Sequence, residues 1–147
     1  MMLTPFWKNW LYLWAAFGIL FGLILAAAAI PALSAPTEGL MTLMNQSDPV
    51  ELSRPMRFSL ALMGCVTVAW GATMAVVFAA CDRLGPAARP YWRASVAILL
   101  IWFVADSSVS IATGFALNAV SNTLFVVAFL IPILASGVLT RSPSERG

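Results

Sequence analysis

The chain of 147 residues contains no histidine, only two cysteines, and charged side chains at just 10% of its positions. The absence of histidine excludes His-ligated haem, the usual zinc and copper sites, and catalytic pairs in which histidine is the base. Cys65 and Cys81 are sixteen residues apart and form no CxxC motif, so they give little support for redox chemistry or metal binding. We therefore expect no catalytic residue, no metal and no cofactor.

Apolar residues are abundant instead, at 61% of the chain, and the mean hydropathy is +0.91. Soluble domains are about 45–50% apolar and about 25% charged, so this composition excludes a soluble globular domain and a disordered chain. Four continuous apolar segments approach or exceed the roughly 20 residues that a membrane-spanning helix needs. The sequence predicts one all-α domain over residues 1–147, with four antiparallel transmembrane helices at about 11–33, 58–81, 93–117 and 123–139.

Basic residues are distributed unequally between the two ends of the predicted bundle. One side carries six of them, whereas the other carries only two. Because cytoplasmic loops are enriched in Lys and Arg, this asymmetry predicts that both termini lie in the cytoplasm. The six are Lys8, Arg83, Arg89, Arg93, Arg141 and Arg146, and the two are Arg54 and Arg57.

Aromatic rings and three of these arginines mark the predicted cytoplasmic surface. The rings of Trp7, Trp10, Tyr12 and Trp14 crowd the start of the first span, where we expect them at the level of the lipid headgroups. A set of three arginines could contact anionic lipid headgroups. Three arginines fall short of a polybasic cluster, so the favoured interpretation is that they only determine the topology. Nucleic acid is not expected as a partner, because no extended basic patch exists. The arginines of this set are Arg83, Arg89 and Arg93.

The segment 34–57 is the only sizeable loop, and its centre has the pattern of a short amphipathic helix. Thr37 can cap such a helix, with Glu38 favourable at its positive end and Pro49 beyond its last turn. An interfacial helix of this kind fits two interpretations: a lid over the end of the bundle, which we favour, or a docking surface for another membrane subunit. Its apolar face would contain Leu40, Met41, Leu43 and Met44.

Small residues at four-residue spacing predict where helices approach closely, because lipid leaves helix association to packing. The first span contains Gly18, Gly22 and Ala26 on one face. This stripe can pair with the second span or with another copy of the chain. Two stripes in the second span are candidates for the partner face: Ala61, Cys65, Ala69 and Thr73, or Gly71, Ala75 and Ala79. In the fourth span, Pro132 would free a backbone carbonyl and bend the helix.

Asp106 is the one acidic residue within a predicted span, and we expect it near the membrane midplane. Its helix face also carries hydroxyl groups and an indole, and Trp70 of the second span lies at the same predicted depth. A bare carboxylate in hydrocarbon is costly, so we expect Asp106 to be protonated or bonded by these groups. It is either a clamp between helices or a proton or cation site. Asn118 and Asn122 are expected to cap the next turn, and the less favoured alternative is that they form part of a polar entrance. The predicted surroundings of Asp106 are Trp102, Ser107, Ser110, Thr113 and Trp70.

Several of these motifs resemble small uncharacterised bacterial membrane proteins with four helices. The likeness covers about residues 58–140 and rests on the segments WGATMAVVF and YWRASVAILLIWFVADSSVS, followed by Asn118, Asn122 and Pro132. In that family a Trp-Phe pair precedes an Asp-Ser or Asp-Thr step, and two asparagines and a proline follow. The resemblance implies a four-helix bundle in the bacterial inner membrane and implies no activity.

Together these features predict a small inner-membrane protein that acts as a non-enzymatic accessory or scaffolding element. Its expected partners are the lipid bilayer and either another membrane subunit or a second copy of the chain. The alternative is a small proton- or cation-coupled transporter that uses Asp106. An enzyme is not expected, because one intramembrane acid without histidine, metal site or nucleophile pair supports no standard mechanism.

Overall fold

The computed structural model describes residues 3–46 and 49–140, and these residues form helices and no strand. The expected all-α class is therefore confirmed. The five α-helices are α1 (Pro5–Ala26), α2 (Ala35–Asn45), α3 (Arg54–Leu84), α4 (Arg89–Ala112) and α5 (Ala116–Ala135). Three short 3₁₀ turns join them: η1 (Ala27–Ala29), η2 (Pro31–Leu33) and η3 (Gly85–Ala88). Arg141 and Arg146 of the basic count lie outside the described residues.

Three helical stretches are long and apolar enough to cross a membrane, by length and composition. They are Pro5–Ala29, Arg54–Ala112 and Ala116–Ala135. The second stretch is continuous through the turn η3 and therefore contains both α3 and α4.

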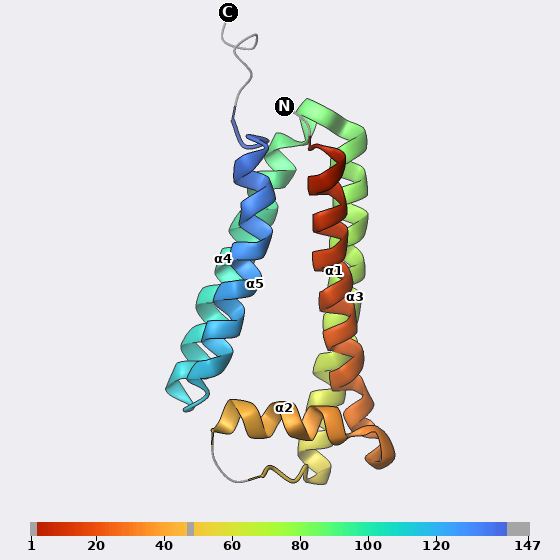
Figure 1. Cartoon of the computed structure of the whole chain (residues 1–147), viewed down its shortest axis with the longest axis vertical. Helices are drawn as coiled ribbons and strands as arrows, with labels where there is room; N and C mark the ends of the chain where they lie inside the picture. Colours follow the sequence, from red (N-terminus) through yellow and green to blue (C-terminus); the bar gives the residue numbers. More distant parts are fainter. Residues whose placement is uncertain (1–2, 47–48, 141–147) are drawn as a thin grey trace, which may run out of the picture.

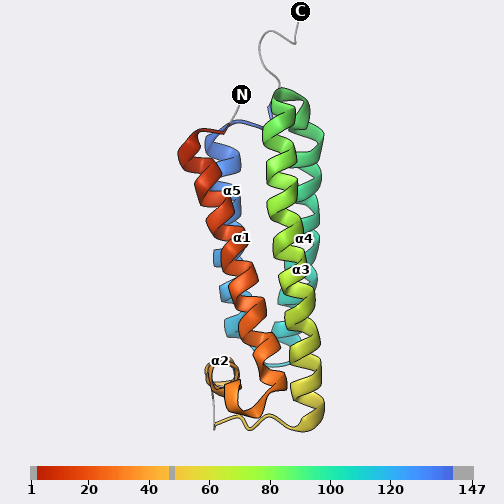
Figure 2. The same ribbon diagram turned by 90° about the vertical axis from the view of Figure 1, so that its right-hand side faces the viewer.

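The four long helices lie lengthwise beside one another, and α2 crosses the end that is opposite to the chain termini (Figures 1 and 2). Helix α1 packs along α3, and α4 packs along α5. Fewer contacts join these two pairs, through α1 with α5 and through α3 with α4. In Figure 1 the pairs lie close together near the termini and diverge toward α2.

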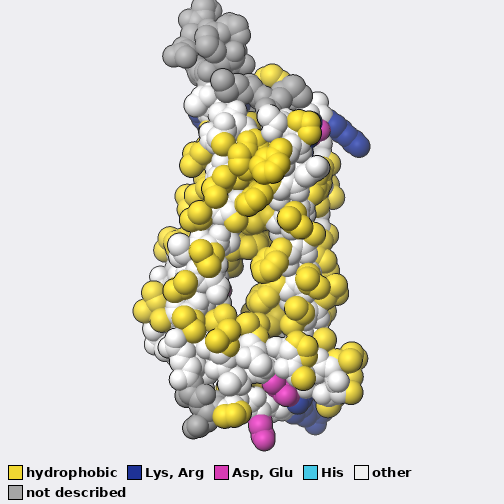
Figure 3. Space-filling view, viewed as in Figure 1, with side chains coloured by type: hydrophobic (Ala, Val, Ile, Leu, Met, Phe, Trp, Pro, Cys, Tyr) yellow, Lys and Arg dark blue, Asp and Glu magenta, His cyan; other side chains and the backbone are white. Residues whose placement is uncertain are grey.

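Two separate hydrophobic clusters explain this divergence. The larger cluster includes Trp14, Phe78, Leu99 and Phe129, and thus unites all four long helices. The smaller one contains buried and half-buried residues of α1, η1, α2, α3 and the loop before α3, but none of α4 or α5. The α4–α5 pair is therefore held to α1–α3 mainly in the half near the termini. Figure 3 shows the result as an opening between the two pairs above α2.

The α4–α5 turn lies earlier in the chain than the sequence predicted. Helix α4 ends at Ala112 because Gly114 adopts φ +87°, which favours glycine, and α5 already begins at Ala116. Asp106 therefore lies six residues, or about 9 Å, from the end of its helix. The expected position near the middle of a span was wrong, because the helix ends five residues before Leu117.

Helix α2 forms where the sequence predicted a short helix, but Thr37 does not cap it. The helix starts at Ala35, and Ser34 occupies its N-cap position. The buried Thr37 hydroxyl instead donates to the carbonyl oxygen of Ile24 at 2.7 Å, near the end of α1. Helix α2 also contacts α5, so it reaches from one helix pair to the other, as a covering element would.

Glycine sets the close approach of α1 and α3. A Cβ atom built on Gly22 would lie 2.7 Å from the backbone nitrogen of Val68, and one on Gly64 would lie 2.3 Å from that of Ala26. Gly22 and Ala26 of the predicted stripe thus lie at this crossing, whereas Gly18 faces Trp70 and Phe125 at ordinary contact distance. Of the two stripes predicted on the second span, the first does not face α1, because Cys65, Ala69 and Thr73 are exposed. The second does, because a Cβ atom built on Gly71 would lie 2.8 Å from the Ile19 side chain and 3.1 Å from the carbonyl oxygen of Ala15.

Candidate functional site

The principal polar site is the Asp106 cluster, which joins α4 to α5. The Oδ1 atom of Asp106 accepts hydrogen bonds from Asn118 Nδ2 at 2.8 Å and from Asn122 Nδ2 at 2.6 Å. Ser110 Oγ lies 3.5 Å from the same oxygen. Two amide groups of α5 therefore converge on one carboxyl oxygen of α4. The cluster consists of Asp106, Ser107, Ser110, Asn118 and Asn122.

The two asparagines use both of their amide hydrogens within this cluster. Asn118 Nδ2 also donates to Ser110 Oγ at 2.8 Å, and Asn122 Nδ2 also donates to Ser107 Oγ at 3.2 Å. Each amide nitrogen has two hydrogens, so neither has a free donor left. Ser110 Oγ in turn donates to the backbone oxygen of Asp106 at 2.8 Å. The result is a closed network of short side chains between two helices.

Burial and charge distinguish Asp106 from its neighbours. Ser107, Ser110 and Asn122 are buried, whereas Asp106 is only half-buried. The ion pairs recorded in the described part of the chain are Lys8–Asp82 and Arg57–Glu38, so neutral amides rather than a cation bond the Asp106 carboxyl group. No hydrogen bond to its Oδ2 atom is recorded among the described residues.

The structure brings some predicted site residues to Asp106 and leaves others away from it. Ser107 and Ser110 belong to the cluster. Trp70 and Trp102 stack on each other instead, with ring centroids 6.3 Å apart, and no indole hydrogen bond to Asp106 is recorded. Thr113 is exposed and donates to backbone oxygens of its own helix, those of Val109 and Ser110. These two indoles and Thr113 therefore do not supply the donors that the sequence predicted.

Asn118 and Asn122 are the residues that sequence reasoning misassigned. They lie in the first two turns of α5 and bond Asp106 instead of capping the turn. The sequence contained a signal for this. In an antiparallel helical hairpin centred on Gly114, positions 106 and 122 are equally far from the turn and therefore lie opposite each other, and so do positions 110 and 118. Locating the turn correctly would have predicted both pairs.

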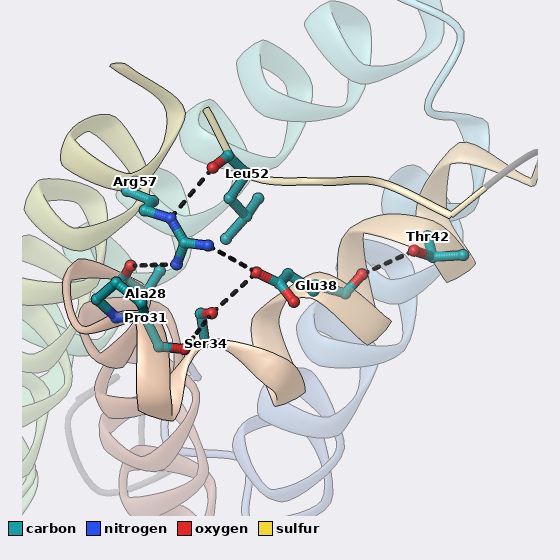
Figure 4. A network of polar contacts seen from close by, with 7 residues as sticks. All are labelled: Ala28, Pro31, Ser34, Glu38, Thr42, Leu52 and Arg57. Carbon is teal, nitrogen blue, oxygen red and sulfur yellow. Dashed lines mark hydrogen bonds and ion pairs between the residues drawn. The ribbon is translucent and has the colours of Figure 1, made fainter. Parts of the chain in front are cut away.

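A second polar site, the Arg57 network, holds α2 against α1 and α3 (Figure 4). The Arg57 guanidinium donates from Nε to Leu52 O at 3.1 Å, from Nη1 to Ala28 O at 3.3 Å, and from Nη2 to Glu38 Oε1 at 2.9 Å. Ser34 Oγ donates to the same Glu38 oxygen at 2.8 Å. One arginine therefore satisfies two backbone carbonyls and one carboxylate that come from three different segments.

Two tryptophans of α1 donate to backbone carbonyls of α5, a helix that contains Pro132. Trp10 Nε1 donates to Ala128 O at 2.8 Å, and Trp14 Nε1 donates to Phe125 O at 2.9 Å. Ala128 lies four residues before Pro132, so its carbonyl is the one that proline leaves without a helical donor. Trp14 is only 5% exposed, so its ring packs inside the protein.

The three arginines of the predicted headgroup site lie around the α3–α4 turn. Arg83 is in the last turn of α3, Arg89 begins α4, and Arg93 follows one turn later. Arg93 Nη2 donates to Leu139 O at 2.9 Å, so it also holds the segment that follows α5. These positions lie at the end of the molecule opposite to α2 (Figure 1).

The Asp106 cluster offers one titratable carboxyl group surrounded by neutral amides and hydroxyls. Such a group can hold a proton, contact a small cation, or join two helices. Within residues 3–46 and 49–140, no group of three His, Cys, Asp or Glu side chains is arranged to hold a metal ion. Comparisons with protein-family models, with curated proteins and with solved structures found no match. The function must therefore be inferred from the geometry of the site.

Proposed function

We propose that this protein is a non-enzymatic accessory or scaffolding element of the bacterial inner membrane. In this proposal α1, α3, α4 and α5 cross the bilayer as an antiparallel four-helix bundle, and both termini face the cytoplasm. Three apolar helical stretches support membrane insertion. The excess of Lys and Arg at the end that carries the termini supports the orientation. The resemblance to small bacterial four-helix membrane proteins supports the setting.

The observation that carries the proposal is the hydrogen bonding of Asn118 and Asn122 to the Asp106 cluster. A site that loads and releases an ion needs ligands that exchange between protein and substrate. In this cluster both amide hydrogens of Asn118 and both of Asn122 are already used between α4 and α5. Hydrogen bonds in membrane proteins contribute about 0.6 kcal/mol each on average, so these four bonds would stabilise the helix pair by roughly 2–2.5 kcal/mol. This arrangement supports a clamp that fixes the fold.

A proton- or cation-coupled transporter is the second candidate, and two observations favour it. Asp106 is half-buried, and its Oδ2 atom has no hydrogen bond recorded among the described residues. The helix pairs also diverge on the side of α2, where Figure 3 shows an opening between them. An aqueous path through that opening to Asp106 would let the carboxyl group exchange protons.

Ion-flux measurements on Asp106 variants distinguish the two candidates. The protein is reconstituted into liposomes that contain a pH-sensitive dye, and gradients of H⁺, Na⁺ or K⁺ are imposed. For a clamp, we expect no flux that depends on Asp106, near-normal stability of Asp106→Asn, and a loss of roughly 1–2 kcal/mol in Asp106→Leu, which leaves the amides unpaired. Asp82→Asn is the matched control, because Asp82 is the acid of the Lys8 ion pair.

The opposite result has a clear signature. If Asp106→Asn stays folded but abolishes an ion flux that the unchanged protein and Asp82→Asn both support, the transporter is the correct function.

The accessory role itself is tested by photo-crosslinking in native membranes. Helix α1 exposes Leu13 and Leu20, whereas Leu11 is fully buried. A photoreactive residue at Leu13 or Leu20 should give one discrete protein adduct, and the same residue at Leu11 should give none. Adducts to lipid alone at both exposed positions would contradict a scaffolding role.

A further inference from the structure

A pocket lies at the start of α3, beside the turns that follow α1. Ala29, Pro31, Arg54, Arg57 and Phe58 line this pocket, which has a volume of about 440 Å³. Two arginines and a phenylalanine thus border one space at the α2 end of the molecule. No predicted site includes this pocket.

Arg57 reaches the pocket with a fixed orientation. Its three hydrogen bonds to Ala28, Leu52 and Glu38 hold the guanidinium between η1, α2 and the loop before α3 (Figure 4). A guanidinium has five N–H donors, so two of them remain beyond these bonds. The side chain of Arg57 is therefore already ordered beside the pocket.

Arg54 supplies the charge that the Arg57 network does not neutralise. It lies three residues before Arg57, on the same side of α3, and is exposed. Glu38 is shared between Arg57 and Ser34, and no ion pair of Arg54 is recorded in the described part of the chain. Glu38 is thus the ion-pair partner of Arg57, whereas Arg54 has none recorded among the described residues.

The apolar lining indicates what kind of anion fits. Phe58 is 69% exposed and follows Arg57 directly, and Pro31 lies on the opposite element. An inorganic anion would use the arginines alone, whereas a phospholipid would also place its glycerol and acyl carbons against the ring. Arginine matches phosphate geometry better than lysine does, because its planar fork donates two parallel hydrogen bonds.

We propose that this pocket binds the phosphate group of an anionic phospholipid, with the first acyl carbons lying along Phe58. The proposal rests on the proposed membrane insertion, because it places the start of α3 at the level of the headgroups. Bound lipid would then join the end of α1 to the start of α3, next to the Arg57 network.

Binding of short-chain phosphatidylglycerol to the detergent-purified full chain tests this proposal. We expect Arg54→Gln to weaken binding roughly tenfold, the loss of one charge-assisted hydrogen bond. Arg54→Lys should recover part of the affinity, and Glu51→Gln, which removes a negative charge outside the pocket lining, should not weaken it. Thermal unfolding of each variant checks the fold, which exposed Arg54 should not alter.

Two further measurements distinguish a lipid phosphate from free phosphate, and failure of this proposal from failure of the proposed function. Inorganic phosphate should bind much more weakly than the lipid, and Phe58→Ala should weaken only lipid binding. Equal binding of both ligands, unaffected by Phe58→Ala, would identify a free-phosphate site and overturn the lipid proposal. Equal lipid affinity of Arg54→Gln and the unchanged chain would also overturn it. Membrane fractionation is independent of this site, so loss of the protein from the membrane fraction would contradict the proposed function instead.

Discussion

The crossing of α1 and α3 predicts a sharp difference between glycine positions that look alike in the sequence. A methyl group on Gly64 would lie 2.3 Å from the backbone nitrogen of Ala26 and 2.5 Å from the carbonyl oxygen of Gly22. Ordinary van der Waals contact begins near 3.4 Å, so Gly64→Ala must move α1 away from α3 by about 1 Å. Both obstacles are backbone atoms, so no side-chain rotation can relieve the overlap.

The energetic cost follows from this displacement. A gap of 0.5–1 Å forfeits about a quarter to a half of each dispersion contact across the interface. Overpacking of a closed interface typically costs about 1–3 kcal/mol, and the better helix propensity of alanine returns at most about 1 kcal/mol. We therefore expect Gly64→Ala to lower the free energy of unfolding by roughly 1–2 kcal/mol.

Gly18 and Gly39 provide matched controls in the same chain. A methyl group on Gly18 would meet Trp70 and Phe125 at 3.8 and 3.9 Å, which is ordinary contact, and one on Gly39 would meet nothing within 4 Å. Gly18→Ala and Gly39→Ala should therefore leave stability unchanged or raise it by up to about 1 kcal/mol.

The assay is reversible unfolding in mixed detergent micelles, followed by tryptophan fluorescence and helical circular dichroism. Gly22→Ala should also destabilise, because its methyl group would lie 2.7 Å from Val68 N and 2.8 Å from Gly64 O. The double variant Gly22→Ala/Gly64→Ala should lose less free energy of unfolding than the two single variants together, because one displacement of α1 relieves both overlaps. Equal stability of Gly64→Ala and Gly18→Ala would refute close packing at this crossing.

Two other predictions concern the tryptophans of α1 and the orientation of the chain. Trp10→Phe should cost about 1 kcal/mol in the natural background, because it removes the donor to Ala128 O, but less in Pro132→Ala, where residue 132 supplies its own N–H to that oxygen. A double-mutant cycle measures this coupling between Trp10 and Pro132, and Trp7→Phe is its control. If the effects of Trp10→Phe and Pro132→Ala simply add, the two residues are not coupled through the Ala128 carbonyl. A reporter that works only in the cytoplasm should be active when it is fused to the C-terminus. Activity only of a reporter that works outside the cytoplasm would reverse the proposed orientation.

Local sequence determined the helical class and the approximate helix positions. Continuous apolar runs, with Pro5 and Pro55 in first turns capped by Thr4 and Ser53, suffice for helices because their backbone hydrogen bonds are internal. The single acidic residue of the α4 segment also stood out without any knowledge of the fold. Pro132 likewise indicated a carbonyl that needs a donor from elsewhere.

Tertiary structure decided which helix faces meet, and for a physical reason. These helices are apolar on all sides, so hydrophobic periodicity does not distinguish the protein interior from the outer surface. The contact face of α3 therefore follows from fit, which places Gly64 at the crossing and leaves neighbouring Cys65 exposed. The same holds for the polar site: only the turn at Gly114 brings Asn118 and Asn122 of α5 opposite Asp106, because each residue added to a helix rotates its side chains by about 100°.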